Sequence, residues 1–387
     1  MRFFIFVFYF FGYFFSFSQQ LVDVGMYTNK KIQNFVFAVN SGRYNVYSEN
    51  GKVIELSLNE MVYVNNMGGG KFSLKSLDTD LGIFKKLTFI GTEYENNFKL
   101  KLINPSYEYR VYEDNLKVWP HPYNNHLTLI NNIFLDNYIS GVVEAEVGKS
   151  PPPEYFKLQA IICRTYALNN LTRHSSDGFN LCDEVHCQAY NGKPKSLAIK
   201  NAALQTNNIV IVDSDINLIT AAFFSNCGGQ TCNSEEVWRL PLPYLRAVKD
   251  TFCLKENNAV WSKSIALSEW KNYIKSKLPC FEIGNNDSAF FNQQNTERKF
   301  LIGTPDCNLT LRQIREDWKL KSAFFTVTLN NEHIEIKGRG FGHGVGLCQE
   351  GAMRMSKLGY SYPFILHYYY SGVHMVDLSF LSFFKEE

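Results

Sequence analysis

A glutamate near the end of a predicted helix is the residue best suited to acid–base chemistry. Glu146 continues the apolar face of a helix predicted over residues 135–147, whereas Glu144 does not. The residues of that face are Leu135, Tyr138, Ile139, Val142 and Val143. A carboxyl group on an apolar face loses hydration, which disfavours its charged form and raises its pKa. Glu146 is therefore a candidate general acid near neutral pH, unless it only ends the helix and points to water.

A loop after the next predicted helix groups cysteine and histidine residues. His174, Cys182 and Cys187 offer one nitrogen and two sulfur atoms within a short stretch. Such a set can bind zinc tetrahedrally with an open fourth position, and His186 is a competing ligand. The alternative is a disulfide between Cys182 and Cys187, which export from the cell favours, with His174 on the surface. We expect zinc, which could simply hold this loop beside Glu146.

Four polar residues lie in or near glycine-containing segments: Gln188, Ser225, His343 and Gln349. Glycine allows backbone and side chains to approach a bulky ligand closely, as a sugar chain in a groove requires. We therefore predict that these four residues contact the substrate. For His343 the alternative is a tight turn over residues 338–346 that packs under the sheet.

The number of cysteines leaves the disulfide pattern open. Nine cysteines in an exported chain could form disulfides, but the number is odd, so at least one is left over. Cys227 and Cys253 could form a structural disulfide near the presumed groove, although their spacing does not fix the pairing. Cys163 lies inside a predicted helix and is expected to be a small buried hydrophobe.

The composition is that of a globular protein that is exported. The 387 residues are 45% apolar and 20% charged, and the formal net charge of +2 gives no argument for binding nucleic acid or an anionic membrane. Met1-Arg2 and an apolar run from Phe3 to Phe15 predict a signal peptide over residues 1–18, because the run is too short to span a bilayer. No later segment is apolar enough to span, so we expect a soluble, secreted protein, periplasmic or associated with the cell wall.

The elements that must position these residues fall into a scaffold and a catalytic region. Residues 19–125 are typical of short strands, with an Asn50-Gly51 hairpin turn. Residues 126–375 form the predicted catalytic region, and residues 376–387 a C-terminal tail. Within the catalytic region we predict helices over residues 135–147, 153–170, 197–205, 347–358 and 365–370. We also predict paired strands at 209–212 and 218–224 and a hairpin at 325–336. Residues 254–323 are loop-rich. The sequence thus predicts a strand-dominated α+β fold with a helical subregion that carries the cleft.

Four separated blocks of the chain resemble the SpoIID/LytB family of stage II sporulation protein D and amidase enhancers. The likeness covers roughly residues 100–375, and the order of the blocks makes it specific. The blocks are Asn137–Glu146 with Gln159–Ala167, Gly178–Tyr190, Phe224–Thr231 with Leu242–Arg246, and Gly342–Ala352 leading to His367.

This resemblance implies lytic transglycosylase activity on peptidoglycan glycan strands, often on strands stripped of stem peptides. Glu146 matches the family's catalytic glutamate. Arg164 matches a family arginine that would orient the substrate or bias the ionisation of Glu146; a salt bridge with an acid such as Glu144 is the alternative. Tyr244 and Arg246 match a Tyr-x-basic pair that holds the glycan.

The resemblance also bears on the metal and on the loop after the glutamate. His174, Cys182 and Cys187 match a His-Cys-Cys set that binds zinc in some family members. The sequence departs from the family at Val147-Gly148, which replaces a common Met-Pro and puts the detailed positioning of substrate in doubt.

A single carboxyl group suffices for this chemistry. Glycosidases use two carboxyl groups, whereas a lytic transglycosylase uses one as acid and then as base, because the sugar's own hydroxymethyl oxygen attacks. We therefore expect cleavage between N-acetylmuramic acid and N-acetylglucosamine, with a 1,6-anhydro product. Two other functions stay open. One is a non-catalytic amidase enhancer that grips glycan and stimulates an N-acetylmuramoyl-L-alanine amidase, and the other is zinc-dependent hydrolysis at the cysteine and histidine loop.

Overall fold

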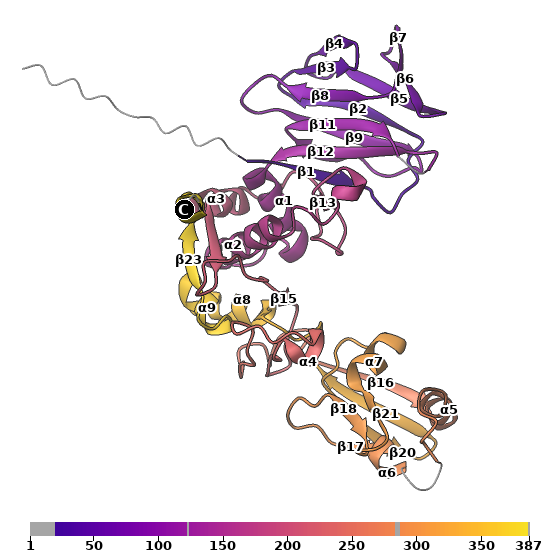
Figure 1. Ribbon diagram of the computed structural model, residues 1–387, viewed down its shortest axis with the longest axis vertical. Coiled ribbons are helices and arrows are strands. Elements are labelled where there is room, and N and C mark those ends of the chain that lie inside the picture. Colours follow the sequence, from indigo (N-terminus) through magenta and orange to yellow (C-terminus); the bar gives the residue numbers. More distant parts are fainter. Residues whose placement is uncertain (1–19, 122–123, 283–286, 386–387) are drawn as a thin grey trace, which may run out of the picture.

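The computed structural model describes residues 20–121, 124–282 and 287–385, so the predicted signal peptide lies outside the described residues. The described residues form three parts arranged as an arc (Figure 1). A β-rich part lies at the top, a mainly helical part at the left, and a smaller β-rich part at the bottom right. The concave side of the arc faces right in this view.

The first part is two sheets that pack face to face, antiparallel throughout except for the parallel pair β13 and β1. One sheet has the order β13-β1-β12-β11-β8-β3-β4 and the other the order β10-β9-β2-β5-β6-β7. The strands are β1 (Leu21–Met26), β2 (Asn34–Ser41), β3 (Tyr44–Ser48), β4 (Gly51–Leu56), β5 (Met61–Gly68), β6 (Lys71–Lys75), β7 (Asp80–Phe84), β8 (Leu87–Gly91), β9 (Asn97–Asn104), β10 (Arg110–Glu113), β11 (Asn115–Pro120), β12 (Leu127–Phe134) and the short β13 (Leu181–Cys182).

Alternating apolar residues form the core between these sheets. Phe35, Phe37 and Val39 of β2 are buried, and the residues between them are less so, as the two-residue period of a strand requires. The Phe37 ring lies 4.4 Å from the Phe89 ring, which joins the two sheets, and 4.9 Å from the Phe98 ring. The predicted hairpin around Asn50-Gly51 is confirmed as β3 and β4.

Three helices follow the first part, and they match the predicted positions. These are α1 (Leu135–Val147), α2 (Pro153–Asn169) and α3 (Leu197–Gln205). Proline at the first turn of α2 fits because its fixed φ suits a helix start and its missing N–H is not needed there. The chain between α2 and α3 contains a short 3-10 helix (Ser175–Asp177) and β13, which pairs in parallel with β1.

The chain after β13 packs directly on α1. A Cβ atom on Gly141 would lie 2.4 Å from the carbonyl oxygen of Gly192 and 2.6 Å from the Tyr190 ring. Only glycine therefore permits this approach between the helix and the loop. The close contact fixes the position of the loop over the C-terminal half of α1.

The rest of the helical part is closed by strands that lie far apart in the sequence. Its elements are β14 (Ile209–Val212), β15 (Phe223–Phe224), α4 (Glu235–Trp238), β22 (Leu347–Cys348), α8 (Gln349–Lys357), α9 (Tyr362–Tyr369), β23 (His374–Asp377) and α10 (Leu378–Lys385). β14 pairs with β23, and β15 pairs in parallel with β22.

These pairings correct two predictions. The strands predicted at 209–212 and 218–224 pair only at their near ends, through the Val212–Leu218 bridge and hydrogen bonds from the Ile219 N–H to Ile211 and from the Asp213 N–H to Asn217. Their main strand partners are instead β23 and β22. The predicted tail from residue 376 begins inside β23, and Leu381 packs against Val210 and Val212. The backbone partner and the apolar cover of β14 thus both come from the end of the chain.

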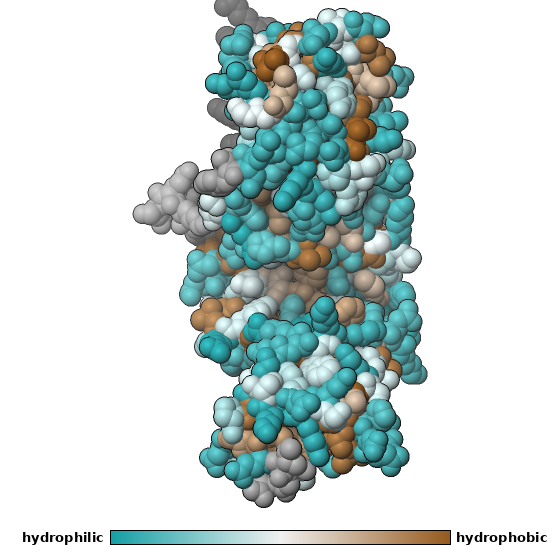
Figure 2. All heavy atoms as spheres, turned by 90° about the vertical axis from the view of Figure 1, so that its right-hand side faces the viewer, coloured by the Kyte–Doolittle hydropathy of each residue, from teal (hydrophilic) through white to brown (hydrophobic). Residues whose placement is uncertain are grey.

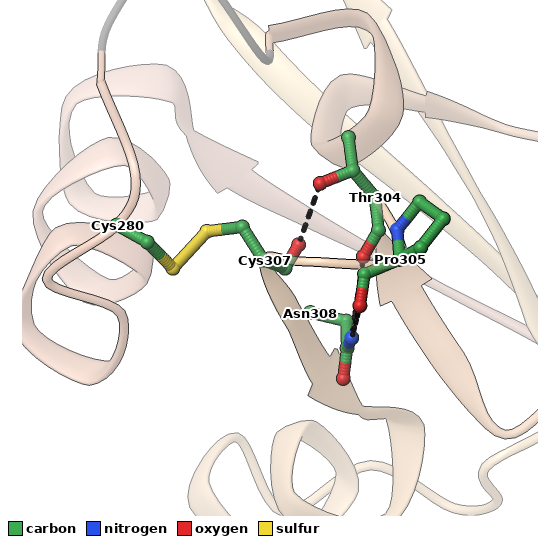
Figure 3. Close-up of a disulfide and its surroundings, with 5 residues drawn as sticks. All are labelled: Cys280, Thr304, Pro305, Cys307 and Asn308. Atoms are coloured by element: carbon green, nitrogen blue, oxygen red, sulfur yellow. Dashed lines mark hydrogen bonds between the residues drawn. A yellow bond between two sulfur atoms is a disulfide. The ribbon is translucent and has the colours of Figure 1, made fainter.

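The third part is a small subdomain with a core of its own. Its four-stranded sheet has the order β16-β21-β20-β17. Its elements are β16 (Val260–Ala266), α5 (Leu267–Lys277), α6 (Asp287–Phe291), β17 (Asn292–Gln293), β18 (Leu301–Gly303), β19 (Asn308–Thr310), α7 (Leu311–Asp317), β20 (Phe325–Asn330) and β21 (His333–Arg339). Trp270 and Ile274 of α5 are fully buried in that core. A disulfide joins Cys280 to Cys307 (Figure 3). The sequence also indicated weak helical patches around Trp270, which α5 confirms, but residues 254–323 hold more strands and helices than the loop-rich prediction allowed. The hairpin at 325–336 is confirmed.

The architecture confirms the predicted strand-dominated α+β class. β12, which follows the predicted boundary at residue 125, pairs with β1 and β11 and is part of the scaffold sheet as far as Phe134. In the described part of the chain, no helix has the length and apolar character needed to cross a membrane.

Candidate active site

Glu146 lies in the last turn of α1, beneath the segment that follows β13. Its side chain is half-buried, and its Oε1 atom accepts a hydrogen bond from the Ala189 N–H at 2.9 Å. Burial raises the pKa of Glu146 above its ordinary value, although the Ala189 hydrogen bond acts in the opposite direction. The carboxyl group is thus sheltered as predicted, and one backbone donor fixes its orientation.

The neighbours of Glu146 come from the facing side of α2. Burial raises the pKa of the Cys163 thiol and of the Tyr155 hydroxyl, and the charge of Glu146 adds to both effects. Tyr155 donates to Gln159 Oε1 at 3.0 Å, and Gln159 donates to Cys163 Sγ at 3.4 Å. The polar groups on this side of α2 therefore bond to one another, and among the described residues none of them is hydrogen-bonded to Glu146.

Glu144 is held by a different part of the loop. Its Oε2 atom accepts the backbone N–H groups of Lys195 and Ser196 at 2.9 and 2.8 Å. A carboxylate with two backbone donors is a structural anchor, so the two acids of this helix have different environments. Among the described residues no second carboxylate perturbs Glu146.

Two of the predicted substrate contacts are glutamines with buried, unpaired polar atoms. Gln188 is 2% exposed and lies beside Cys163, and neither its Oε1 nor its Nε2 has a well-formed hydrogen bond among the described residues. The same holds for Nε2 of Gln349 in the first turn of α8. An unsatisfied buried polar group costs about 1–3 kcal/mol, so such atoms are candidates for binding a ligand.

Arg164 does not contact Glu146, contrary to the expectation from the sequence. It is fully buried, and its guanidinium group donates to Asp136 at 2.9 Å. It also donates to the carbonyl oxygens of Thr206 (2.7 Å), Ala203 (3.1 Å) and Ile209 (3.1 Å). The salt bridge is with Asp136 rather than Glu144, because Arg164 points to the end of α3 instead of the end of α1. Arg164 is therefore a positioning residue that joins α1, α2, α3 and β14.

Tyr244 and Arg246 lie together near α4. The Tyr244 hydroxyl accepts the Thr220 N–H at 3.1 Å, and its ring is 7% exposed. Arg246 binds both oxygens of Glu235, at 2.9 and 2.7 Å, and remains half-exposed. Both polar ends are thus engaged within the protein, and a glycan would meet the exposed edge of Arg246 only.

His343 and Ser225 hold loops near the junction with the third part. His343 Nε2 bonds to the Phe223 carbonyl oxygen at 3.0 Å, and its Nδ1 accepts the Val345 N–H at 3.1 Å. Burial lowers the pKa of His343 to about 4, so the ring is neutral at ordinary pH. Its ring also packs on Trp238. Ser225 Oγ accepts from Asn258 Nδ2 at 3.3 Å. His343 thus acts mainly as the turn residue that was the alternative reading.

The cysteine and histidine loop brings four potential ligands together. Ligand atoms of His174, Cys182, His186 and Cys187 all lie within 4.8 Å of one another. The Nδ1 atom of His174 pairs with Asp177 at 2.9 Å, whereas its buried Nε2 atom has no partner among the described residues. His186 Nδ1 lies 3.8 Å from the Cys182 sulfur and 3.9 Å from the Cys187 sulfur. Cys182 and Cys187 are not bonded to each other.

This donor set fits zinc, which prefers four nitrogen or sulfur ligands in a tetrahedron. The carboxylate of Asp177 would fix the His174 ring so that Nε2 faces the metal, as second-shell acids do in zinc sites. Four protein donors leave no open position for water, so the set suits a structural metal. The sequence analysis missed Asp177, whose spacing of three residues from His174 was a usable signal. It also missed the Ala189 N–H, a backbone group that no side-chain pattern reveals.

The segment that supplies the Ala189 N–H to Glu146 follows β13, and β13 faces the concave side of the arc in Figure 1. Figure 2 looks onto this side and shows it hollowed between the two β-rich parts, with a largely hydrophobic floor. Together, fold and site define a strand-dominated α+β protein with a sheltered acid at a helix end.

Comparison with known proteins identifies the family. Residues 123–212 match the stage II sporulation protein family, SpoIID. Stage II sporulation protein D of Bacillus subtilis is 30% identical over 267 residues, which are 64% of this chain and 76% of that protein. An uncharacterised protein of Brachyspira hyodysenteriae is 28% identical over 274 residues, 66% of this chain and 70% of that protein. The chain belongs to the SpoIID family.

A further relative bears a different name. The amidase enhancer of Bacillus subtilis is 27% identical over 290 residues, which are 62% of this chain and 40% of that protein. The shared region therefore covers less than half of the enhancer.

Removal of the charge on Asp136 tests the positioning role of Arg164. Asp136→Asn leaves a buried guanidinium group without its counter-charge, and we expect the free energy of unfolding to fall by about 3–5 kcal/mol. Urea denaturation measures this change. Lys157→Gln is the matched control, because it breaks the more exposed pair with Glu154 on α2 and should cost less than about 1 kcal/mol. Equal effects of the two substitutions would show that Arg164 does not depend on Asp136.

The burial of Glu146 predicts a particular dependence of stability on pH. The pKa of Glu146 in the folded protein lies above the ordinary value of 4.5. Between the unfolded-state pKa and this raised pKa, the folded state binds more protons than the unfolded state, so stability falls as pH rises through that range. Glu146→Gln keeps an acceptor for the Ala189 N–H but does not ionise. The variant should therefore gain stability relative to the wild type as pH rises from about 4 to 8 in urea titrations. A constant difference would mean that the carboxyl group is hydrated.

Proposed function

We propose that this protein is a peptidoglycan lytic transglycosylase in which Glu146 acts first as acid and then as base. The observation that carries the proposal is the sheltered Glu146 carboxyl group, with a raised pKa and a single backbone donor on one oxygen. The second oxygen has no hydrogen bond among the described residues and would be the one to meet the substrate. A raised pKa keeps more of the group protonated near neutral pH, which a general acid needs.

The environment of Glu146 supports a mechanism with one carboxyl group. Glycosidases place two carboxyl groups about 5–9.5 Å apart, on opposite sides of the scissile bond. Glu144 is bound to two backbone N–H groups and is not free to serve as the second group. An internal nucleophile on the sugar removes the need for a base that activates water.

The proposed reaction balances with Glu146 alone. The Glu146 proton passes to the glycosidic oxygen between N-acetylmuramic acid and N-acetylglucosamine, and the bond from that oxygen to C1 of muramic acid breaks. The muramic acid O6 then bonds to C1, and its proton returns to Glu146. The products are a 1,6-anhydro muramic acid end and a free 4-hydroxyl on N-acetylglucosamine. Because the attacking O6 belongs to the same sugar as C1, its effective concentration is high, which further accelerates the reaction.

Two glutamines would help to bind the glycan. The buried amide of Gln188 and the Nε2 atom of Gln349, which have no well-formed hydrogen bond among the described residues, are suited to the hydroxyl and N-acetyl groups of a sugar chain. The hydrophobic floor in Figure 2 suits the apolar faces of sugar rings. Peptidoglycan lies outside the cytoplasm, which agrees with the predicted signal peptide and with a periplasmic or cell-wall location.

Replacement of Glu146 tests the proposal. Glu146→Gln should lower the cleavage of purified glycan strands by about 10²-fold or more, since general acid–base catalysis is worth about 10²–10⁴-fold. Mass spectrometry of the digests should show 1,6-anhydro ends with the wild type. Glu144→Gln is the matched control on the same helix and should keep cleavage within a few-fold. Products with water added would instead indicate hydrolysis.

A non-catalytic function is the second candidate, because one relative is named amidase enhancer. In that case neither wild type nor Glu146→Gln would cleave glycan strands. Both would bind glycan and would accelerate an added N-acetylmuramoyl-L-alanine amidase to the same degree. Cleavage assays with and without the amidase therefore separate the two functions.

We further propose that His174, Cys182, His186 and Cys187 hold a structural zinc ion. The four donors would supply all the ligands of a tetrahedral ion, so the site lacks the open position that zinc-dependent hydrolysis needs. The ion would stabilise the segment that carries Gln188 and Ala189, and through the Ala189 N–H it would act on Glu146.

Removal of this metal should loosen the loop without abolishing the fold. Cys182→Ser combined with Cys187→Ser should lose one zinc ion per chain in elemental analysis. Cleavage should fall because the Ala189 N–H no longer fixes the carboxyl group, while the far-ultraviolet circular dichroism stays close to wild type. An unchanged zinc content, or a Cys182–Cys187 disulfide in mass spectra of the wild type, would contradict the assignment.

A further inference from the structure

A second cluster of potential ligands lies in the core behind β15 and β22. Cys227, Asp250, Cys253 and Cys348 are each 0% exposed, and their ligand atoms all lie within 4.8 Å of one another. The Cys227 sulfur is 3.3 Å from the Cys253 sulfur and 3.3 Å from Asp250 Oδ2. The four residues come from three separate segments of the chain.

These separations are close to those of a tetrahedral metal site. Zinc–sulfur bonds of about 2.3 Å and zinc–oxygen bonds of about 2.0 Å place two sulfur ligands roughly 3.8 Å apart, and a sulfur and an oxygen roughly 3.5 Å apart. The observed distances of 3.3 Å thus need shifts of only a few tenths of an ångström. Thiolate sulfur is the ligand that favours zinc over magnesium or calcium.

Groups around the cluster are arranged as an outer shell. The Cys227 N–H donates to the Cys348 sulfur at 3.3 Å. The Asp250 carboxyl group accepts the Phe252 N–H at 2.8 Å and the Tyr369 hydroxyl at 2.9 Å, one on each oxygen. In metal sites, such hydrogen bonds orient the ligand side chains and tune their basicity.

The cluster holds four donor groups and no positive partner. In the described part of the chain no lysine, arginine or histidine forms an ion pair with Asp250, whose carboxyl group contacts the Cys227 thiol at 3.3 Å. A disulfide between Cys227 and Cys253 would consume two sulfur atoms, yet it would leave the Asp250 carboxyl group and the Cys348 thiol side by side in the core. A divalent cation would engage all four groups.

We propose that Cys227, Asp250, Cys253 and Cys348 bind a zinc ion with a structural role. The ion joins the segment after β15, the loop at residues 250–253 and the end of β22. Cys348 directly precedes Gln349, so the ion also fixes the start of α8. This site is separate from the cysteine and histidine loop, and the proposal does not depend on the catalytic function.

The test uses the full chain with Cys182→Ser and Cys187→Ser, exported into an oxidising compartment so that disulfides can form. Elemental analysis should find about one zinc ion per chain in this background. Exchange for Co²⁺ should give the charge-transfer absorption of thiolate ligands. Asp250→Asn should weaken zinc binding roughly tenfold or more, since even outer-shell changes cost 10–100-fold. Cys232→Ser is the matched control, a buried cysteine of the same core outside the four donors, and should bind zinc as before.

A measurement on the unaltered chain keeps the proposal testable if a variant fails to fold. The protein is denatured with iodoacetamide and no reductant, and its peptides are examined by mass spectrometry. Labelling of Cys227, Cys253 and Cys348, with zinc released in proportion, supports the site. A Cys227–Cys253 disulfide, or free thiols without bound zinc, overturns it.

Discussion

The buried charge of Arg164 is the constraint on which the rest of the helical part depends. A guanidinium group with no exposed surface must find both a counter-charge and acceptors for its N–H groups. Asp136 of α1 supplies the charge, and three carbonyl oxygens at the end of α3 and in β14 supply the acceptors. These bonds fix the angle between the helices, so the far end of α1, where Glu146 lies, has a defined position.

A second contact, between α1 and the loop after β13, fixes the position of the Glu146 carboxyl group. The loop after β13 packs on α1 because Gly141 has no side chain, and the same loop delivers the Ala189 N–H to Glu146. β13 ties the start of this loop to the scaffold sheet through β1. The proposed zinc ion would close the loop between these two anchors. The β-rich scaffold thus contributes to the site although it carries none of its acids.

Local patterns were enough to predict some elements but not others. The bounds of α1 and the start of α2 followed from apolar periodicity and proline placement, which depend on neighbours along the chain. The partners of β14 and β15 lie more than a hundred residues later, and no local signal identifies them. The predicted role of Arg164 beside Glu146 was wrong for the same reason, because the groups that accept its hydrogen bonds are mostly backbone carbonyl oxygens distant in the sequence. The short elements of residues 260–339 are stabilised by a shared core and a disulfide rather than by strong periodicity.

The degree of burial of Glu146 follows from two opposing requirements of a single-carboxyl mechanism. Full exposure would leave the group ionised at neutral pH, and it would have no proton to give. Full burial would raise its pKa further, but no sugar could reach it. Half-burial, with the Ala189 N–H on one oxygen and no hydrogen bond on the other among the described residues, meets both requirements. The Cys163 thiol and the Tyr155 hydroxyl near Glu146 belong to α2, the helix that Arg164 holds against α1, so the buried ion pair and the surroundings of Glu146 are parts of one arrangement.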